Sequence, residues 1–180
     1  MSLHVPGAAG APGLRLRPLR PCDEVPAIAA HHAFSAENFT FLLDYSAGEP
    51  WAAYLERLSD LARAVRVPRD RVPSAFLVAV VDGTIVGRVS VRDELRASLA
   101  VTGGHIGYGV LAEHRRQGYA TLMLRQALVV ARARGVDDVL VTCDDDNAGS
   151  IRVIERCGGV LEGLVETPGA PRRTRRYWIR

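Results

Sequence analysis

The alternation of apolar and polar residues predicts mixed strands and helices in the first half of the chain. Residues 14–19, LRLRPL, alternate and predict a strand that ends at Pro18. Helical spacing of apolar residues indicates helices over 22–34 and 51–66. Two β-rich runs flank Asp82-Gly83, a dipeptide that favours the tight turn of a hairpin. We therefore expect a strand, two helices and a hairpin.

The second half alternates strands with helices and ends in two strands. Residues 103–111, GGHIGYGVL, predict a glycine-rich strand, and 118–134 predict an amphipathic helix that Gly135 stops. A buried strand over 137–143 and a helix over 147–159, capped by Asn147, follow. The last runs, GVLEGLV and RRTRRYWIR, predict a hairpin. The order is that of an α/β protein with a mixed sheet, with one domain over 14–180 after a disordered tail over 1–13.

Composition narrows the class of protein. Hydrophobic residues make up 48% and charged residues 24%, which is typical of globular proteins, and no apolar run approaches the ~20 residues of a membrane span. Three cysteines without a CxxC pattern indicate free thiols and a cytoplasmic protein. All 23 basic residues are arginine, so a phosphate loop with the Walker lysine is excluded. We expect neither a metal nor a membrane partner.

Positive charge and glycine coincide at the start of the predicted helix at 118. Arg115 and Arg116 lie just before Gly118, where the first backbone N–H groups of a helix are unpaired and the helix dipole is positive. A glycine there lets a phosphate approach the backbone closely. The segment therefore predicts an anion-binding loop, with an ordinary helix start as the alternative.

Two motifs in register resemble the acetyl-coenzyme A (acetyl-CoA) signature of the GCN5-related N-acetyltransferase family. The first is R-x-x-G-x-A at Arg115, Gly118 and Ala120, after a strand, and the second is N-x-x-S at Asn147 and Ser150, opening a helix that ends in glycine. The resemblance covers nearly the whole of 14–180. It implies a central, mostly antiparallel sheet that splays at the CoA-binding strand and is flanked by helices.

The resemblance also implies where acetyl-CoA, as co-substrate, would bind. Backbone groups of Val110 and Leu111 would bond pantetheine, and Asn147 and Ser150 would approach its far end. The loop around the pyrophosphate would consist of Arg115, Arg116, Gln117, Gly118, Tyr119, Ala120 and Thr121.

The catalytic groups depart from the family pattern. Ile154 stands where many members carry the tyrosine that protonates the leaving thiolate. Tyr108 is the candidate general acid in place of that tyrosine, and the alternative is that its side chain only packs against its neighbours. Glu94 and His105 are the candidate bases that would take a proton from the amine. The alternative for Glu94 is a solvated residue at a strand end, and the alternative for His105 is a sheet histidine whose hydrogen bonds are satisfied.

These features predict an N-acetyltransferase that passes an acetyl group directly from acetyl-CoA to a primary amine. The alternative is a non-catalytic acyl-CoA-binding sensor or interaction module. The arginines of 172–176 read as a solvated strand edge, so we expect no nucleic acid partner, whereas the last strand would be able to pair in a homodimer. The aromatic residues of 34–51 either line the acceptor pocket or cover the hydrophobic core.

Overall fold

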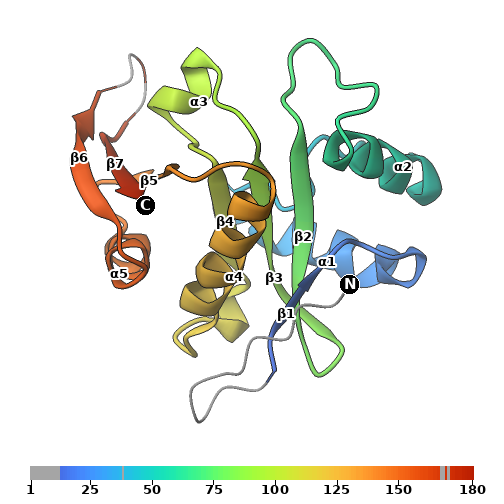
Figure 1. The fold of residues 1–180 in the computed structure, drawn as a ribbon. Coiled ribbons are helices and arrows are strands. Elements are labelled where there is room, and N and C mark those ends of the chain that lie inside the picture. The colour runs from blue at the N-terminus through green and yellow to red at the C-terminus, as the bar shows by residue number, and fades with distance from the viewer. Residues whose placement is uncertain (1–12, 38, 167–168, 170) are drawn as a thin grey trace.

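Two antiparallel sheets form the centre of the molecule (Figure 1). The computed structural model describes residues 13–37, 39–166, 169 and 171–180, so the predicted tail lies outside them except for Gly13. The first sheet has the order β1-β2-β3-β4, and the second has the order β5-β7-β6. The strands are β1 (Arg15–Arg17), β2 (Ser74–Val81), β3 (Thr84–Arg92), β4 (Ile106–Val110), β5 (Val139–Asp144), β6 (Val160–Val165) and β7 (Thr174–Ile179).

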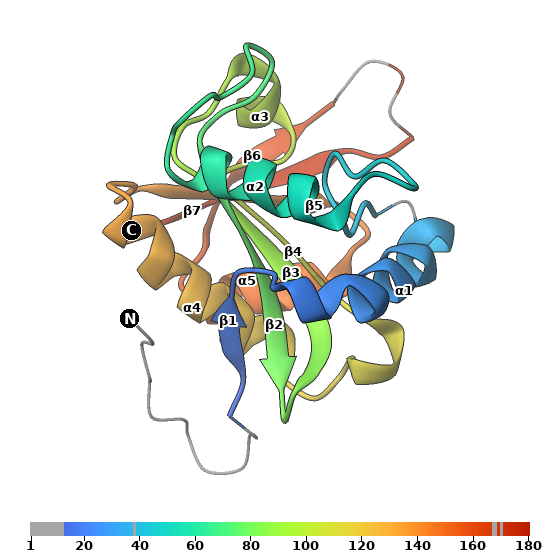
Figure 2. The ribbon, with the colours of Figure 1, turned by 90° about the vertical axis from the view of Figure 1, so that its right-hand side faces the viewer.

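Helices cover both faces of the first sheet. The helices of the described residues are α1 (Glu24–Phe34), α2 (Trp51–Ala62), α3 (Ala97–Val101), α4 (Tyr119–Ala133) and α5 (Ala148–Arg156), with short 3₁₀ turns η1 (Pro21–Asp23), η2 (Ser35–Glu37) and η3 (Ala112–His114). Of these, α1 and α2 pack on one face of the first sheet and α4 packs on the other. Along β2, Leu77 and Ala79 pack with α4, whereas Phe76 and Val78 pack with α1 and α2 (Figure 2). This alternation follows from the two-residue period of a strand. Within the described residues, no helix is both long and apolar enough to cross a bilayer.

The predicted splay lies between β4 and β5. The His105 N–H donates to the Leu140 carbonyl (2.8 Å), and the Leu140 N–H donates to His105 Nδ1 (2.9 Å). Beyond this junction the ladders separate, because β4 pairs only with β3 and β5 pairs only with β7. The mostly antiparallel, splayed sheet predicted from the sequence is therefore confirmed.

Two local predictions need correction. Helix α2 ends at Ala62 rather than 66, because Ala64 adopts a φ of 56° and the Val65 N–H closes the helix end on the Asp60 carbonyl (2.9 Å). Helix α3 was not predicted, since five residues carry too little periodicity to stand out. The Asp82-Gly83 hairpin is confirmed, with φ of 47° and 83° at the two turn residues.

Gly104 holds the two sheets together, and we expect Gly104→Ala to destabilise the protein. Its φ is 61°, and an added Cβ would lie 2.4 Å from the Leu140 carbonyl oxygen. Backbone strain and overpacking together predict a loss of about 2–5 kcal/mol in the free energy of unfolding. Urea denaturation measures this loss. Gly163→Ala in β6 is the control, because its Cβ would meet nothing within 4 Å; equal effects of the two substitutions would contradict the assignment.

Candidate active site

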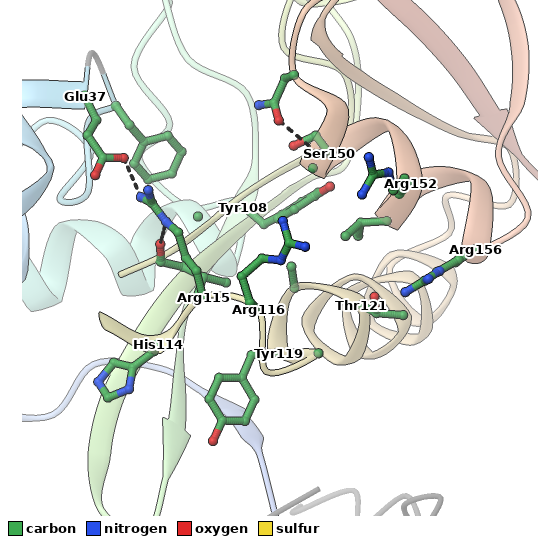
Figure 3. Close-up of a pocket in the computed structure, with 18 of the residues that line it drawn as sticks. Glu37, Tyr108, His114, Arg115, Arg116, Tyr119, Thr121, Ser150, Arg152 and Arg156 are labelled. Carbon is green, nitrogen blue, oxygen red and sulfur yellow. Dashed lines mark hydrogen bonds and ion pairs between the residues drawn. The ribbon is translucent and has the colours of Figure 1, made fainter. Parts of the chain in front are cut away.

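A cavity of about 690 Å³ opens where the two sheets separate (Figure 3). Its walls come from the end of β4, the start of α4, the start of α5, and the segment from the end of α1 through η2 to Phe39. This volume lies within the ~300–1,000 Å³ of ordinary ligand pockets. Elements that are far apart in the sequence thus meet around one space.

The loop before α4 presents unpaired backbone N–H groups to the cavity. Arg116 and Gly118 have φ of 63° and 82°, so the chain turns sharply before the helix begins at Tyr119. Among the residues described, none accepts a hydrogen bond from the N–H groups of 116–120. Successive N–H groups in such a turn, together with the positive end of a helix of 15 residues, form an anion-binding concavity.

Arginine side chains add positive charge beside this loop. Arg116, Arg152 and Arg156 line the cavity, and none of them lies in an ion pair with a carboxylate of the described residues (Figure 3). Arg115 differs, because its guanidinium pairs with Glu37 and its Nε donates to the Val110 carbonyl (2.9 Å). Arg115 therefore fastens the loop to β4 and to η2.

The register of β4 decides which of its backbone groups face the splay. The Leu111 N–H donates to the Val86 carbonyl (2.9 Å), and the Leu111 carbonyl accepts from the His114 N–H (2.9 Å). Alternate residues of an antiparallel strand face opposite neighbours, so the backbone groups of Tyr108 and Val110 point away from β3. Both Leu111 backbone groups are thus paired within the chain, which contradicts the prediction that they bond a ligand, whereas the role predicted for the Val110 N–H stays a prediction.

Tyr108 carries a buried hydroxyl into the cavity. The hydroxyl has no hydrogen-bond partner within the described part of the chain, and it points toward α5 near Ser150 (Figure 3). Burial raises the pKa of the Tyr108 phenol, and the neighbouring Ser150 hydroxyl only partly opposes this rise. The phenol therefore stays protonated at neutral pH and is able to donate a proton.

The start of α5 forms the opposite wall. Asn147 caps the helix, because its Oδ1 accepts from the Ser150 N–H (3.0 Å). Asn147 and Ser150 both line the cavity, as do Gly118, Tyr119, Ala120 and Thr121. Ile154 is fully buried in the core that α4 and α5 share, so it presents no polar group to the cavity.

Four predicted site residues do not line the cavity, namely Leu111, described above, and Glu94, His105 and Gln117. Glu94 is exposed in the bend after β3, at the end of the sheet opposite Val110. His105 is buried at the junction of the sheets, where its Nδ1 accepts from the Leu140 N–H and burial lowers its pKa. Gln117 is exposed and contacts the Glu113 carbonyl at 3.5 Å. The structure therefore brings neither predicted base to the cavity.

Residues that the sequence did not assign to a site complete the walls. Glu37 comes from a segment about 70 residues before β4, and Asp144, Arg152 and Arg156 flank the α5 motif. Phe34 and Phe39, two of the aromatic residues predicted either to line the acceptor pocket or to cover the hydrophobic core, also line the cavity. The two arginines lie on the helix that the second motif opens, so helical spacing from Asn147 was a signal for them. No comparable pattern marks the first segment. Within the described ranges, no group of three His, Cys, Asp or Glu side chains is placed to hold a metal ion.

A comparison with protein families places the chain. Residues 32–159 match the family model described as "Acetyltransferase (GNAT) family". The chain belongs to this family of acetyl-CoA-dependent N-acetyltransferases. A comparison with curated proteins gives no match.

Solved structures agree on the fold. RimJ of Mycobacterium smegmatis, in complex with CoA-disulfide, superposes with a TM-score of 0.67 at 22% identity over 92% of this chain and 81% of that one. The ribosomal-protein-S5-alanine acetyltransferase of Vibrio fischeri gives 0.69 at 18% identity, over 92% of each chain. The putative acetyltransferase yncA of Salmonella typhimurium, with its cofactor acetyl-CoA, gives 0.59 at 16% identity, again over 92% of each.

Proposed function

We propose that this chain binds acetyl-CoA in the cavity and transfers its acetyl group directly to a primary amine. The observation that carries the proposal is the row of unpaired N–H groups at 116–120 beside three arginines without carboxylate partners. Such a site suits a pyrophosphate, and Gly118 keeps the approach open because nothing lies within 4 Å of its Cβ position. Acetyl-CoA, when bound, supplies an activated acetyl thioester.

The residues of β4 would act on the thioester. The Val110 N–H faces the splay and would donate to the carbonyl oxygen as negative charge develops there, which is the contribution of an oxyanion hole. When the amine forms the new C–N bond, the C–S bond breaks and its electron pair leaves with sulfur. The Tyr108 hydroxyl would then give its proton to that sulfur and regain one from solvent.

Glu37 is the carboxylate on the side where the acceptor would enter. It lines the cavity beside Phe34 and Phe39, across from the arginines of α5 (Figure 3), and a proton that it accepted would weaken its pair with Arg115. We propose that Glu37, directly or through a water, accepts the proton that the amine loses. An ordinary amine with a pKa near 10.4 is mostly protonated at pH 7, so a base in this position would raise the reactive fraction.

Thiol release from acetyl-CoA, measured against a panel of amines, tests the proposed function. We expect release that depends on the amine and that gives an N-acetylated product. A thermal shift with CoA but no release with any amine would favour a non-catalytic acyl-CoA-binding sensor. If CoA causes no thermal shift and no amine supports thiol release, the CoA site is refuted.

We expect Arg152→Gln combined with Arg156→Gln to weaken CoA binding tenfold or more. Each side chain offers charge-assisted hydrogen bonds to phosphate, and these are worth about 1.5–3 kcal/mol when well formed. Calorimetric titration at two salt concentrations measures the loss, and salt dependence should also decrease. Arg132→Gln on α4 is the control, since Arg132 is exposed and does not line the cavity. Equal affinities in the double variant and the control would contradict the assignment.

A further inference from the structure

Arg88 is a buried cation without an acidic partner. It lies on β3 with 4% of its surface exposed. Its Nη2 donates to the Thr40 carbonyl (2.6 Å), its Nη1 donates to Ser90 Oγ (3.1 Å) and lies 3.4 Å from the Gly107 carbonyl, and its Nε has no partner within the described residues. All of these acceptors are neutral, so the charge of the guanidinium is not compensated.

Arg92 lies on the same face of β3 and adds a second positive charge that no carboxylate of the described residues compensates. Its Nη1 donates to the Gly104 carbonyl (3.0 Å), also a neutral acceptor. Burial lowers the pKa of both guanidiniums, and burial together with the charge of Arg92 lowers that of Arg88 to about 9. None of the ion pairs found in the described residues includes Arg88 or Arg92. Residues 1–12, 38, 167–168 and 170 contain no Asp or Glu, so the chain holds no further carboxylate to offer.

The two guanidiniums converge on β4 next to the cavity. A Cβ placed on Gly107 would lie 3.2 Å from Ser90 Oγ, 3.7 Å from Arg88 Nη1 and 3.8 Å from Arg92 Nη1. Gly107 directly precedes Tyr108, whose hydroxyl enters the cavity. Because β4 carries glycine at 107 and 109, no β4 side chain separates this face from the arginines.

Phe39 forms the boundary between Arg88 and the cavity. Its ring lies 4.2 Å from Arg88 Cζ and also lines the cavity. An ion buried without a counter-ion is unfavourable, and an arginine fork matches a carboxylate or phosphate with two parallel hydrogen bonds. An anionic group that displaced the Phe39 ring would meet the Arg88 guanidinium, whose Nε has no partner within the described residues. Because Arg88 is 4% exposed and lies behind Phe39, the group that reaches it has to be small.

We propose that Arg88 and Arg92 form a subsite for an anionic group of the acceptor, so that the acceptor is a small amine that carries a carboxylate or phosphate. This inference rests on the proposed acetyl transfer at the same cavity. The arginines would hold the anion on the α1 and α2 face of β4 and leave the amine free to reach the thioester in the splay.

Matched acceptors test the subsite on the full chain. The panel consists of L-amino acids as free acids and as their amides, and of O-phosphoethanolamine with ethanolamine. Thiol release gives kcat and KM for each, and calorimetry with CoA present gives acceptor affinity independently of turnover. We expect at least a tenfold lower KM for the charged member of one pair. The amino acid and phosphoethanolamine arms distinguish a carboxylate from a phosphate.

Substitutions then assign the preference to the arginines. Arg88→Gln and, as the less buried alternative, Arg92→Gln should raise KM for the charged acceptor at least tenfold and leave KM for its neutral partner within twofold. Affinity for CoA should not change. Arg88→Lys should restore part of the preference, and Arg132→Gln should leave it intact.

Several results would overturn the subsite. These are equal KM values for charged and neutral partners in the wild type, a preference that survives both glutamine variants, or no response to any member of the panel. CoA binding with release to neutral amines would refute the subsite alone and leave the proposed function standing. Absence of CoA binding would refute the proposed function itself.

Discussion

Gly118→Val is expected to abolish measurable CoA binding while the protein stays folded. Gly118 has a φ of 82°, a conformation that a β-branched residue adopts only with strain. The valine would shift the loop out of this conformation and turn the N–H groups of 116–120 away from a common point. We expect an increase in Kd of a hundredfold or more, which corresponds to about 2.7 kcal/mol. Calorimetric titration with CoA measures it.

Gly135→Val is the control that separates loss of the anion-binding loop at 116–120 from general backbone strain. Gly135 has a φ of 85°, lies at the other end of α4 and, like Gly118, has nothing within 4 Å of its Cβ position. Both variants should therefore lose a similar amount of stability, whereas only Gly118→Val should lose CoA. A Gly118→Val protein that binds CoA within threefold of the wild type would show that the loop does not hold the coenzyme.

Tyr108→Phe is expected to lower kcat by about 10²–10⁴-fold, the usual contribution of general acid catalysis. The variant removes only a buried hydroxyl that has no partner at hydrogen-bond geometry within the described residues, so the free energy of unfolding should stay equal or rise. The KM for acetyl-CoA should change little. Stopped assays of thiol release and urea denaturation measure the two effects separately.

The pH profile adds a second readout for Tyr108. Because burial raises the pKa of the phenol above its ordinary value of about 10, the proton needed for catalysis is present throughout the neutral range and is lost only at higher pH. The wild type should show a basic limb of kcat above about pH 10, and Tyr108→Phe should lack it. Tyr119→Phe is the control, since that side chain points away from the Tyr108 hydroxyl (Figure 3). Undiminished kcat in Tyr108→Phe would remove Tyr108 from the mechanism.

Local sequence patterns sufficed for the fold and for half of the site. The turn at Asp82-Gly83, the loop at Arg115 and the cap at Asn147 each depend on residues within a few positions of one another. Their physical causes, a left-handed turn, an open helix start and an N-cap, are visible in the residue types themselves. This is why the side of the cavity that we propose for CoA was predictable.

The acceptor side depends on contacts that no local pattern records. Glu37 and Phe39 reach the cavity through the packing of α1 against β3 and of the Phe39 ring against Gly109 of β4. Arg88 reads in the sequence as an ordinary polar position of a strand, and its burial follows only from the loop at Thr40 that covers it. For His105, the alternative of a satisfied sheet histidine agrees with the structure, because the ring accepts from the neighbouring strand.

Long-range strand pairing also explains why Glu94, one of the predicted bases, does not line the cavity. Glu94 and Tyr108 are close in sequence, but β3 and β4 are antiparallel, so the bend after Arg92 lies at the His105 end of the sheet. The cavity lies at the Val110 end. Register, which follows from long-range pairing, decides which carboxylate faces the cavity.

The most direct test of acetyl transfer follows the acetyl carbon itself. Acetyl-CoA labelled in its acetyl group is incubated with the protein and an amine that supports thiol release, and labelled amine is compared with released thiol. Direct transfer predicts one labelled amine for each thiol and no label on the protein. Thiol without labelled amine, or label that stays on the protein, would contradict the account.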